Sequence, residues 1–332
     1  MEILVTGGTG FVGGWCIRLL LDRGYAVRTT VRDPRREPSV RSNFPDAGER
    51  LRIAVADLSS DEGWAEAIAG VSGVLHVASP MGGGSDPKDP ETLIRPAREG
   101  ALRVLRAAID AGVPRVVMTS SGAAATPPPG ASGVFDETLW TNPDQPGLDA
   151  YRRSKAIAER AAWDLVASSS GATELATVLP GAVFGPPLSP EPRSSVEVIA
   201  RMLRGMPGVP RIGLQIVDVR DLALLHLLAL ESPQATGRRF LAVGGYLWMR
   251  EVAAILRASL GDDASRVPTR ELPDWVVRLL ARVQPELGQL VPMLGRRYSY
   301  STAAAQALGW QPRPVEDTIV ETGRSLIAAS RG

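Results

Sequence analysis

Short apolar runs of strand length alternate with longer segments of helical apolar spacing along the first 180 residues of the chain. The apolar runs predict β-strands at residues 3–5, 25–31, 51–56, 73–77, 115–119 and 173–179. The longer segments predict helices at residues 11–23, 61–69, 91–111 and 151–168. Alternation of this kind predicts parallel strands with helices on both faces, which is an α/β doubly wound sheet.

The pattern changes after Pro180. Residues 183–192 are rich in proline and predict a loop. The next segments predict two helices and one strand, at residues 196–204, 222–231 and 212–219. We predict that residues 1–180 form one domain, to which residues 212–243 return. The remaining segments are predicted to form a smaller, mostly helical substrate-binding cap: residues 181–211 and 244–332.

Composition excludes several classes of partner and site. The formal net charge of +1 leaves no electrostatic footprint for nucleic acid or an anionic membrane. The chain has one cysteine, Cys16, so it cannot form an internal disulfide or a metal site with several cysteines. Its two histidines, His76 and His226, are well separated, which argues against a zinc site or a Ser-His-Asp triad. The N-terminus lacks a signal-peptide pattern, and no apolar run has transmembrane length. We therefore expect a cytoplasmic monomer or homodimer without a metal.

A glycine-rich turn follows the first predicted strand and precedes the first predicted helix. Gly7 permits the tight turn, Gly10 lets the backbone approach a pyrophosphate, and Gly13 lets the helix pack on the strand. Phe11 and Val12 begin the helix, whose free N–H groups point toward phosphate. This placement predicts a dinucleotide-binding site.

The end of the second predicted strand distinguishes NADP from NAD. An NAD site usually has an acidic residue there, but this chain has Val31 followed by Arg32. Arg32 can pair with the 2′-phosphate of NADP, although Asp33 beside it could neutralise the charge. The sequence leaves open the contribution of three further arginines: Arg35, Arg36 and Arg41. We predict NADPH as the cofactor.

The chain has 37 basic residues, of which only Lys88 and Lys155 are lysine. Lys155 follows Tyr151 by four residues on a predicted helix, so the two side chains share a face. An ammonium close to a phenol favours the phenolate form, which suits Tyr151 to donate and accept a proton. An exposed i,i+4 pair on a surface helix is the alternative reading of this spacing.

Hydroxyl groups at the end of the fifth predicted strand argue against an exposed surface pair and favour a site. Ser120 and Ser121 follow Thr119 at the carboxyl end of the strand, where ligands bind in such sheets. One of the two serines could serve only as a helix cap or a turn former.

The sequence resembles the extended short-chain dehydrogenases/reductases of the NAD-dependent epimerase/dehydratase superfamily, which have a Rossmann fold. Within them it is similar to the branch of dihydroflavonol reductases, cinnamoyl-CoA reductases and aldehyde reductases. The matching segments are VTGGTGFVG (residues 5–13), TVRDP (30–34), ADL (56–58), HVASP (76–80), TSS (119–121), YRRSK (151–155), PGAVFGP (180–186), VDVRDLA (217–223) and ALGWQP (307–312).

The resemblance implies roles for individual residues. Ser121 matches the catalytic serine, Tyr151 the acid/base, and Lys155 the lysine that also holds the nicotinamide ribose. The other implied cofactor contacts are Asp57 and Leu58 at the adenine, Val77, Ala78 and Ser79 along the cofactor, Pro180 and Val183 at the nicotinamide, and Ser195 at a phosphate.

The chain departs from the family pattern around the expected substrate pocket. Residues 122–125 are plainer than usual, Arg220 stands where many relatives carry an acid, and residues 81–85 are unusually rich in glycine. Candidates for the apolar lining, each of which could equally be core, are Met81, Phe184, Met202, Met206, Trp248 and Trp275.

These features together predict an NADPH-dependent oxidoreductase that reduces a small-molecule aldehyde or ketone to an alcohol. Hydride would reach the carbonyl carbon, while Ser121 stabilises the oxygen and Tyr151 protonates it. Two alternatives stay open at this point. One is an NAD-dependent nucleotide-sugar epimerase or dehydratase, and the other is a sensor that binds the dinucleotide without catalysis.

Overall fold

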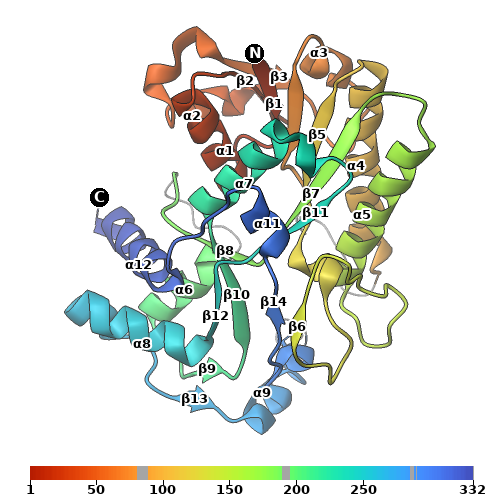
Figure 1. Ribbon diagram of the computed structural model, residues 1–332. Helices are drawn as coiled ribbons and strands as arrows, with labels where there is room; N and C mark the ends of the chain where they lie inside the picture. The colour runs from red at the N-terminus through yellow and green to blue at the C-terminus, as the bar shows by residue number, and fades with distance from the viewer. Residues whose placement is uncertain (81–88, 189–194, 285–287, 289, 332) are drawn as a thin grey trace.

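A parallel seven-stranded sheet forms the centre of this computed structural model, which describes residues 1–80, 89–188, 195–284, 288 and 290–331 (Figure 1). In spatial order the strands are β11 (Arg239–Ala242), β7 (Glu174–Pro180), β5 (Arg115–Thr119), β4 (Gly73–His76), β1 (Glu2–Val5), β2 (Ala26–Val31) and β3 (Leu51–Val55). Every pairing between neighbouring strands in this sheet is parallel.

Helices cover both faces of this sheet. One face carries α1 (Phe11–Asp22) and α7 (Val219–Glu231), and the other carries α3 (Trp64–Ile68), α4 (Glu91–Asp110) and α5 (Ala150–Ser168). The alternation of side chains along β1 divides the core, because Ile3 and Val5 pack with α1 and α7 whereas Leu4 packs with α3 and α4. The predicted doubly wound α/β fold is confirmed.

A smaller sheet lies at the carboxyl end of β7. Its strands in spatial order are β12 (Gly245–Trp248), β10 (Gly213–Asp218) and β8 (Ala182–Phe184). Its apolar core is shared with three helices: α6 (Val196–Arg204), α8 (Met249–Leu260) and α12 (Val315–Arg331). The C-terminal region therefore contains a sheet in addition to its helices (Figure 1).

One sequence-based expectation is wrong in this region. Part of the proline-rich segment predicted as a loop over residues 183–192 is strand β8, because it pairs with the neighbouring β10. Within residues 212–243, β10 pairs in the small sheet, β11 pairs in the central sheet, and α7 packs on the central sheet, while the predicted domain division stays a prediction.

The remaining elements are short. Strand β6 (Val134–Phe135) pairs with β14 (Ser299–Tyr300), and β9 (Val209–Pro210) pairs with β13 (Glu271–Leu272). The other short helices are α2 (Glu37–Arg41), α9 (Asp274–Leu280) and α11 (Ala303–Ala307). Short 3₁₀ helices are η1 (Pro34–Arg36), η2 (Pro45–Arg50), η3 (Gly122–Ala125), η4 (Pro233–Ala235), η5 (Gly261–Ala264) and η6 (Val291–Met293).

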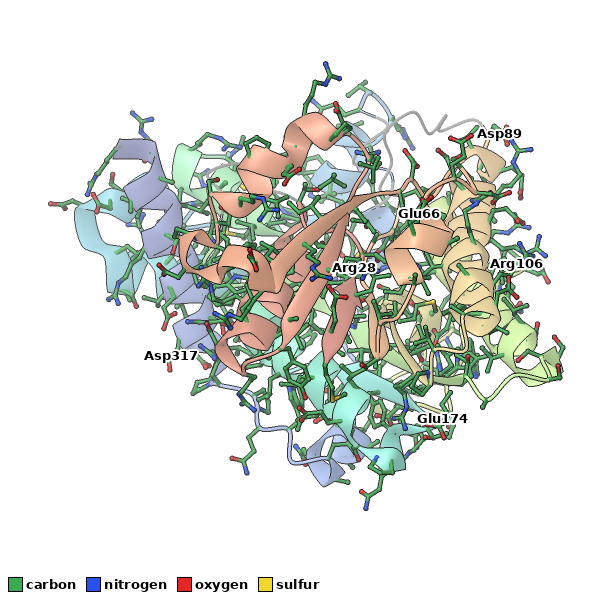
Figure 2. The ribbon with its side chains drawn as sticks, turned by 90° about the horizontal axis from the view of Figure 1, so that it is seen from above. Arg28, Glu66, Asp89, Arg106, Glu174 and Asp317 are labelled. Atoms are coloured by element: carbon green, nitrogen blue, oxygen red, sulfur yellow. The ribbon has the colours of Figure 1, made fainter. Side chains whose placement is uncertain are left out.

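Arg28 secures the end of the central sheet that lies away from the small sheet. Its guanidinium donates to the backbone carbonyls of Glu66, Ala67 and Ala69 at the end of α3, and it forms an ion pair with Glu2 at 2.6 Å. Figure 2 shows Arg28 reaching from β2 toward the helix that carries Glu66. A cation at a helix C-terminus is favourable, so this contact fixes α3 against β2.

Candidate active site

The predicted site residues lie along the carboxyl edge of the central sheet. Most of them follow β1 to β5 or lie at the end of β7, whereas Tyr151 and Lys155 lie on α5 and Ser195 precedes α6. Strand β8 of the small sheet begins two residues after β7 ends (Figure 1). Ligands of parallel α/β sheets bind outside this edge. The candidate residues therefore lie where a ligand of this fold would bind.

The glycine turn leaves no room for side chains between β1 and α1. Gly7 has a φ of +77°, which glycine adopts without strain, and its carbonyl accepts from the Gly10 N–H at 2.9 Å. A Cβ atom on Gly13 would lie 2.3 Å from the Gly7 carbonyl oxygen. The turn therefore brings backbone N–H groups and the start of α1, at Phe11 and Val12, to one open surface.

Thr6 joins the loop after β4 to this turn. Its hydroxyl accepts from the backbone N–H of Val77 at 3.0 Å and of Ala78 at 2.9 Å, and it lies 2.9 Å from His76 Nδ1. A Cβ atom on Gly7 would approach Ala78 Cβ to 3.0 Å. Thr6 was not among the site residues predicted from the sequence, because a threonine after a strand has no distinguishing local pattern.

The carboxylate of Asp33 is engaged by Arg35 rather than by Arg32. Arg35 Nη2 lies 2.7 Å from Asp33 Oδ2, and hydrogen bonds from Arg35 lower the pKa of Asp33. Arg32 is exposed and forms no ion pair within the described part of the chain. Arg41 is held by Glu37, whose carboxylate accepts from Arg41 Nε at 2.8 Å. Arg32 therefore keeps its charge available beside the end of β2.

Asp57 and Leu58 follow β3 at the same edge. Asp57 Oδ1 accepts from the backbone N–H and the hydroxyl of Ser59, both at 2.8 Å, which shapes a tight turn. Leu58 lies against α4, where a Cβ atom on Gly100 would approach Leu58 Cβ to 3.1 Å. Both residues are thus ordered by local contacts at the edge where an adenine is expected.

The hydroxyl groups of Tyr151 and Ser121 meet at this edge. Tyr151 Oη donates to Ser121 Oγ at 3.4 Å, and Ser121 Oγ also accepts from the Ala123 N–H at 3.1 Å. Tyr151 is 37% exposed whereas Ser121 is buried at 8%, so the Tyr151 side chain reaches from the surface to a buried hydroxyl at this edge. A donor and acceptor pair is therefore available to a ligand there.

Lys155 lies one turn further along α5 and is almost buried. Its ammonium donates to Ser79 Oγ at 2.9 Å and lies 5.7 Å from the centre of the Tyr151 ring. Burial and the charge of Lys155 lower the pKa of His76 to about 3, so this histidine is neutral. The expected shared face of Tyr151 and Lys155 is thus directed toward the ends of β4 and β5.

The two serines after β5 have different surroundings. Ser120 Oγ donates to the buried carboxylate of Glu159 at 2.7 Å, whereas Ser121 contacts Tyr151. Glu159 also accepts from Thr177 Oγ1 at 2.7 Å and from Arg239 Nε at 2.9 Å. This cluster around Glu159 was not predicted from the sequence. The spacing along the sequence could have indicated it, because Glu159 lies eight residues after Tyr151 and so returns to the same side of α5.

The predicted nicotinamide contacts lie where the two sheets meet. Pro180 ends β7, and its carbonyl oxygen would be 3.3 Å from a Cβ atom on Gly122, which follows Ser121. Val183 lies in β8 opposite Val217. Ser195 directly precedes α6, which packs against the small sheet.

The predicted apolar lining is only partly available to a ligand. Phe184 and Met202 are fully buried in the core of the second region. Met206 and Trp248 are half-buried, and Trp275 is 67% exposed. Phe184 and Met202 are therefore core residues and do not line a pocket.

A cavity of about 560 Å³ lies beside β6, away from the predicted site residues. Its lining residues are Val134, Phe135, Asp136, Thr138, Leu139, Trp140 and Ser301. None of them is among the residues predicted for catalysis or cofactor binding.

Met81 and the glycine-rich segment 81–85 lie outside the described residues. Within the described residues, no group of three or more His, Cys, Asp or Glu side chains could hold a metal ion. In the same part of the chain, no helix combines the length and apolarity needed to cross a membrane.

Comparison with known proteins places these features in a family context. The family model described as "NAD dependent epimerase/dehydratase family" matches residues 3–244. Cinnamoyl-CoA reductase 1 of Petunia hybrida is 34% identical over 331 residues, which cover 98% of this chain and 91% of the petunia protein. Dihydroflavonol 4-reductase of Dianthus caryophyllus is 34% identical over 283 residues, covering 81% and 75% of the respective chains.

A solved structure has the same fold. Yeast methylglyoxal/isovaleraldehyde reductase Gre2, crystallised with NADPH, superposes with a TM-score of 0.84. The sequences are 24% identical, and the alignment covers 100% of this chain and 99% of the yeast chain. The shared architecture thus extends through the small sheet and its helices.

Proposed function

The chain belongs to the NAD dependent epimerase/dehydratase family, and from this premise we propose that it is an NADPH-dependent reductase converting an aldehyde or ketone to an alcohol. The observation that carries the proposal is the contact of Tyr151 with Ser121 at 3.4 Å, with the Lys155 ammonium beside the Tyr151 ring. Relatives that are at least 34% identical include a cinnamoyl-CoA reductase and a dihydroflavonol 4-reductase, which supports carbonyl reduction.

The glycine turn and Arg32 fit the proposed cofactor. Added side chains would clash with Ala78 at Gly7 and with the Gly7 carbonyl at Gly13, so only glycine allows the tight turn that a pyrophosphate site uses. No carboxylate among the described residues pairs with Arg32 beside β2, and Arg35 already neutralises the neighbouring Asp33. This charge favours NADPH, which carries a 2′-phosphate, over NADH. When bound, NADPH supplies the hydride.

In the proposed mechanism the protein stabilises and protonates the substrate oxygen. As hydride is added to the carbonyl carbon, the oxygen gains negative charge and accepts a hydrogen bond from the Ser121 hydroxyl. Tyr151 then donates its phenolic proton to that oxygen. The Lys155 ammonium stabilises the phenolate that is left, since an adjacent positive charge favours the ionised form.

We assign the two regions different roles in this proposal. The central sheet and its helices bind the dinucleotide, and the region built on the small sheet binds the carbonyl substrate. Strand β10 therefore belongs to the substrate side, although its sequence position falls between elements of the two regions. Ser195 is proposed as a phosphate contact at the start of α6.

The test is NADPH oxidation measured over a panel of aldehydes, α-ketoesters, diketones and aryl ketones, with NADH in parallel. We expect turnover with NADPH for at least one class and a much weaker rate with NADH. Mass spectrometry of the purified protein should show no retained NAD. Tightly retained NAD without carbonyl reduction would favour an epimerase or dehydratase. NADPH binding without turnover over the panel would favour a sensor.

A further inference from the structure

Glu159 is a buried carboxylate on the helix that carries the proposed catalytic residues. It follows Tyr151 and Lys155 at successive intervals of four residues on α5, so the three side chains lie along one side of the helix. Glu159 is fully buried, yet the mechanism above gives it no part. A buried charge is costly unless it is paired, so its partners indicate what it holds in place.

Four close hydrogen bonds satisfy the Glu159 carboxylate. Oε2 accepts from Ser120 Oγ at 2.7 Å and from Arg239 Nη2 at 3.1 Å. Oε1 accepts from Thr177 Oγ1 at 2.7 Å and from Arg239 Nε at 2.9 Å. The contact links α5 to the ends of β5 and β11 and to the interior of β7.

Arg239 also contacts the segment of residues 137–140, which precedes α5 in the sequence. Its Nη1 donates to the carbonyl oxygens of Glu137 at 2.6 Å and Leu139 at 2.7 Å, and its guanidinium lies 3.6 Å from the centre of the Trp140 ring. Arg239 is 8% exposed, so both charges of the pair are held away from water. A bidentate pair of this kind has strongly preferred geometry and resists relative movement of its elements.

Ser120 connects this buried pair to the reacting groups. It is the residue immediately before Ser121, and its side chain bonds to the helix that carries Tyr151. Displacement of Ser120 relative to α5 would therefore change the separation of the Ser121 and Tyr151 hydroxyls. Thr177 bonds to the same carboxylate from β7, but it has no covalent neighbour among the proposed catalytic residues.

We propose that Glu159, held by Arg239, is a positioning residue that acts through Ser120 to set the distance between the Ser121 and Tyr151 hydroxyls. The proposal deepens and rests on the proposed reductase function. It differs from a purely structural role, because stability would depend equally on the Ser120 and Thr177 hydrogen bonds whereas the catalytic distance would depend on Ser120.

The test compares Ser120→Ala with the matched control Thr177→Val. Each variant loses one 2.7 Å hydrogen bond to Glu159. We expect both to lower the Tm by a similar few degrees. Ser120→Ala should lower kcat by about 10-fold to 100-fold, the scale of loss from small misplacement of reacting groups. Thr177→Val should keep kcat within about twofold, and the Kd for NADPH should not change in either variant.

Crystal structures of the two variants provide a readout that does not depend on activity. The distance between Ser121 Oγ and Tyr151 Oη should lengthen in Ser120→Ala and stay near its original value in Thr177→Val. An unchanged kcat in Ser120→Ala, or equal losses of kcat in both variants, would overturn the positioning role of Glu159 but not the proposed reductase function. Absence of carbonyl reduction by the unmodified protein would overturn the proposed function and the inference with it.

Discussion

Replacement of Arg32 by alanine should distinguish NADPH from NADH binding. Arg32 directly follows Val31, the last residue of β2, and its side chain is exposed. Asp33, which could have neutralised it, pairs with Arg35 through contacts of 2.7 to 3.0 Å. The Arg32 charge is therefore free to act on the 2′-phosphate that only NADPH carries.

The size of the effect follows from the exposure of this site. Two unit charges separated by about 4 Å interact by about 1 kcal/mol in bulk water and about 4 kcal/mol at the effective dielectric constant near a protein surface. An exposed arginine lies between these limits. We expect a loss of about 1.4 to 2.8 kcal/mol, which is a 10-fold to 100-fold rise in the Kd for NADPH.

The assay is a fluorescence titration of both reduced cofactors with the unmodified protein and Arg32→Ala. The Kd for NADH should stay within about twofold, and the difference between the proteins should shrink at about 1 M salt, where the Debye length is about 3 Å. Arg35→Ala should weaken NADPH binding to a smaller extent, because it releases the Asp33 carboxylate. Equal loss of affinity for both cofactors in Arg32→Ala would refute the assignment of the 2′-phosphate site.

Three further predictions test the reacting groups and the buried histidines. Tyr151→Phe should lower kcat by about 100-fold to 10,000-fold with NADPH affinity nearly intact, and retained turnover in a steady-state assay would contradict the mechanism. Lys155→Arg keeps the charge but replaces a compact ammonium with a wide planar group, so we expect a kcat loss of at least about 100-fold, and full activity would show that charge alone suffices. Burial lowers the pKa of His76 to about 3 and of His226 to about 4, both from 6.5. The folded protein keeps both neutral while the unfolded chain binds protons, so stability is fully present above pH 6.5 and falls as the pH drops toward these values. Urea unfolding should show about 2 kcal/mol lost per histidine by about pH 5, and His226→Gln should remove about half of this dependence, whereas an unchanged stability would contradict it.

Periodicity along the chain was sufficient for most of the central sheet. The runs at residues 115–119 and 196–204 coincide with β5 and α6, because alternation of apolar residues and the helical repeat are local properties of the sequence. Boundaries differ where a cap decides them. The helix predicted from residue 222 begins at Val219, since the Asp218 carboxylate accepts from the Arg220 N–H and starts the helix earlier.

The small sheet could not be predicted in the same way. Strand β8 has three residues within a proline-rich stretch and exists because it pairs with β10, more than thirty residues later in the sequence. The strand predicted at residues 212–219 corresponds to β10, but its local pattern does not indicate that it pairs with β8. Non-local hydrogen bonds and the shared apolar core of α6, α8 and α12 stabilise it.

The sequence by itself determined the kind of site: a glycine turn between a strand and a helix, Arg32 in place of an acid, and Tyr151 with Lys155 at helical spacing. These are short-range signals, because each depends on residues within one or two turns of each other. The family resemblance already implied Ser121 as the catalytic serine, but only the tertiary structure gives the physical reason why Ser121, and not Ser120, contacts Tyr151. That choice depends on a hydrogen bond from Ser120 to Glu159, 39 residues away, and such contacts between distant side chains exist only once the elements have packed.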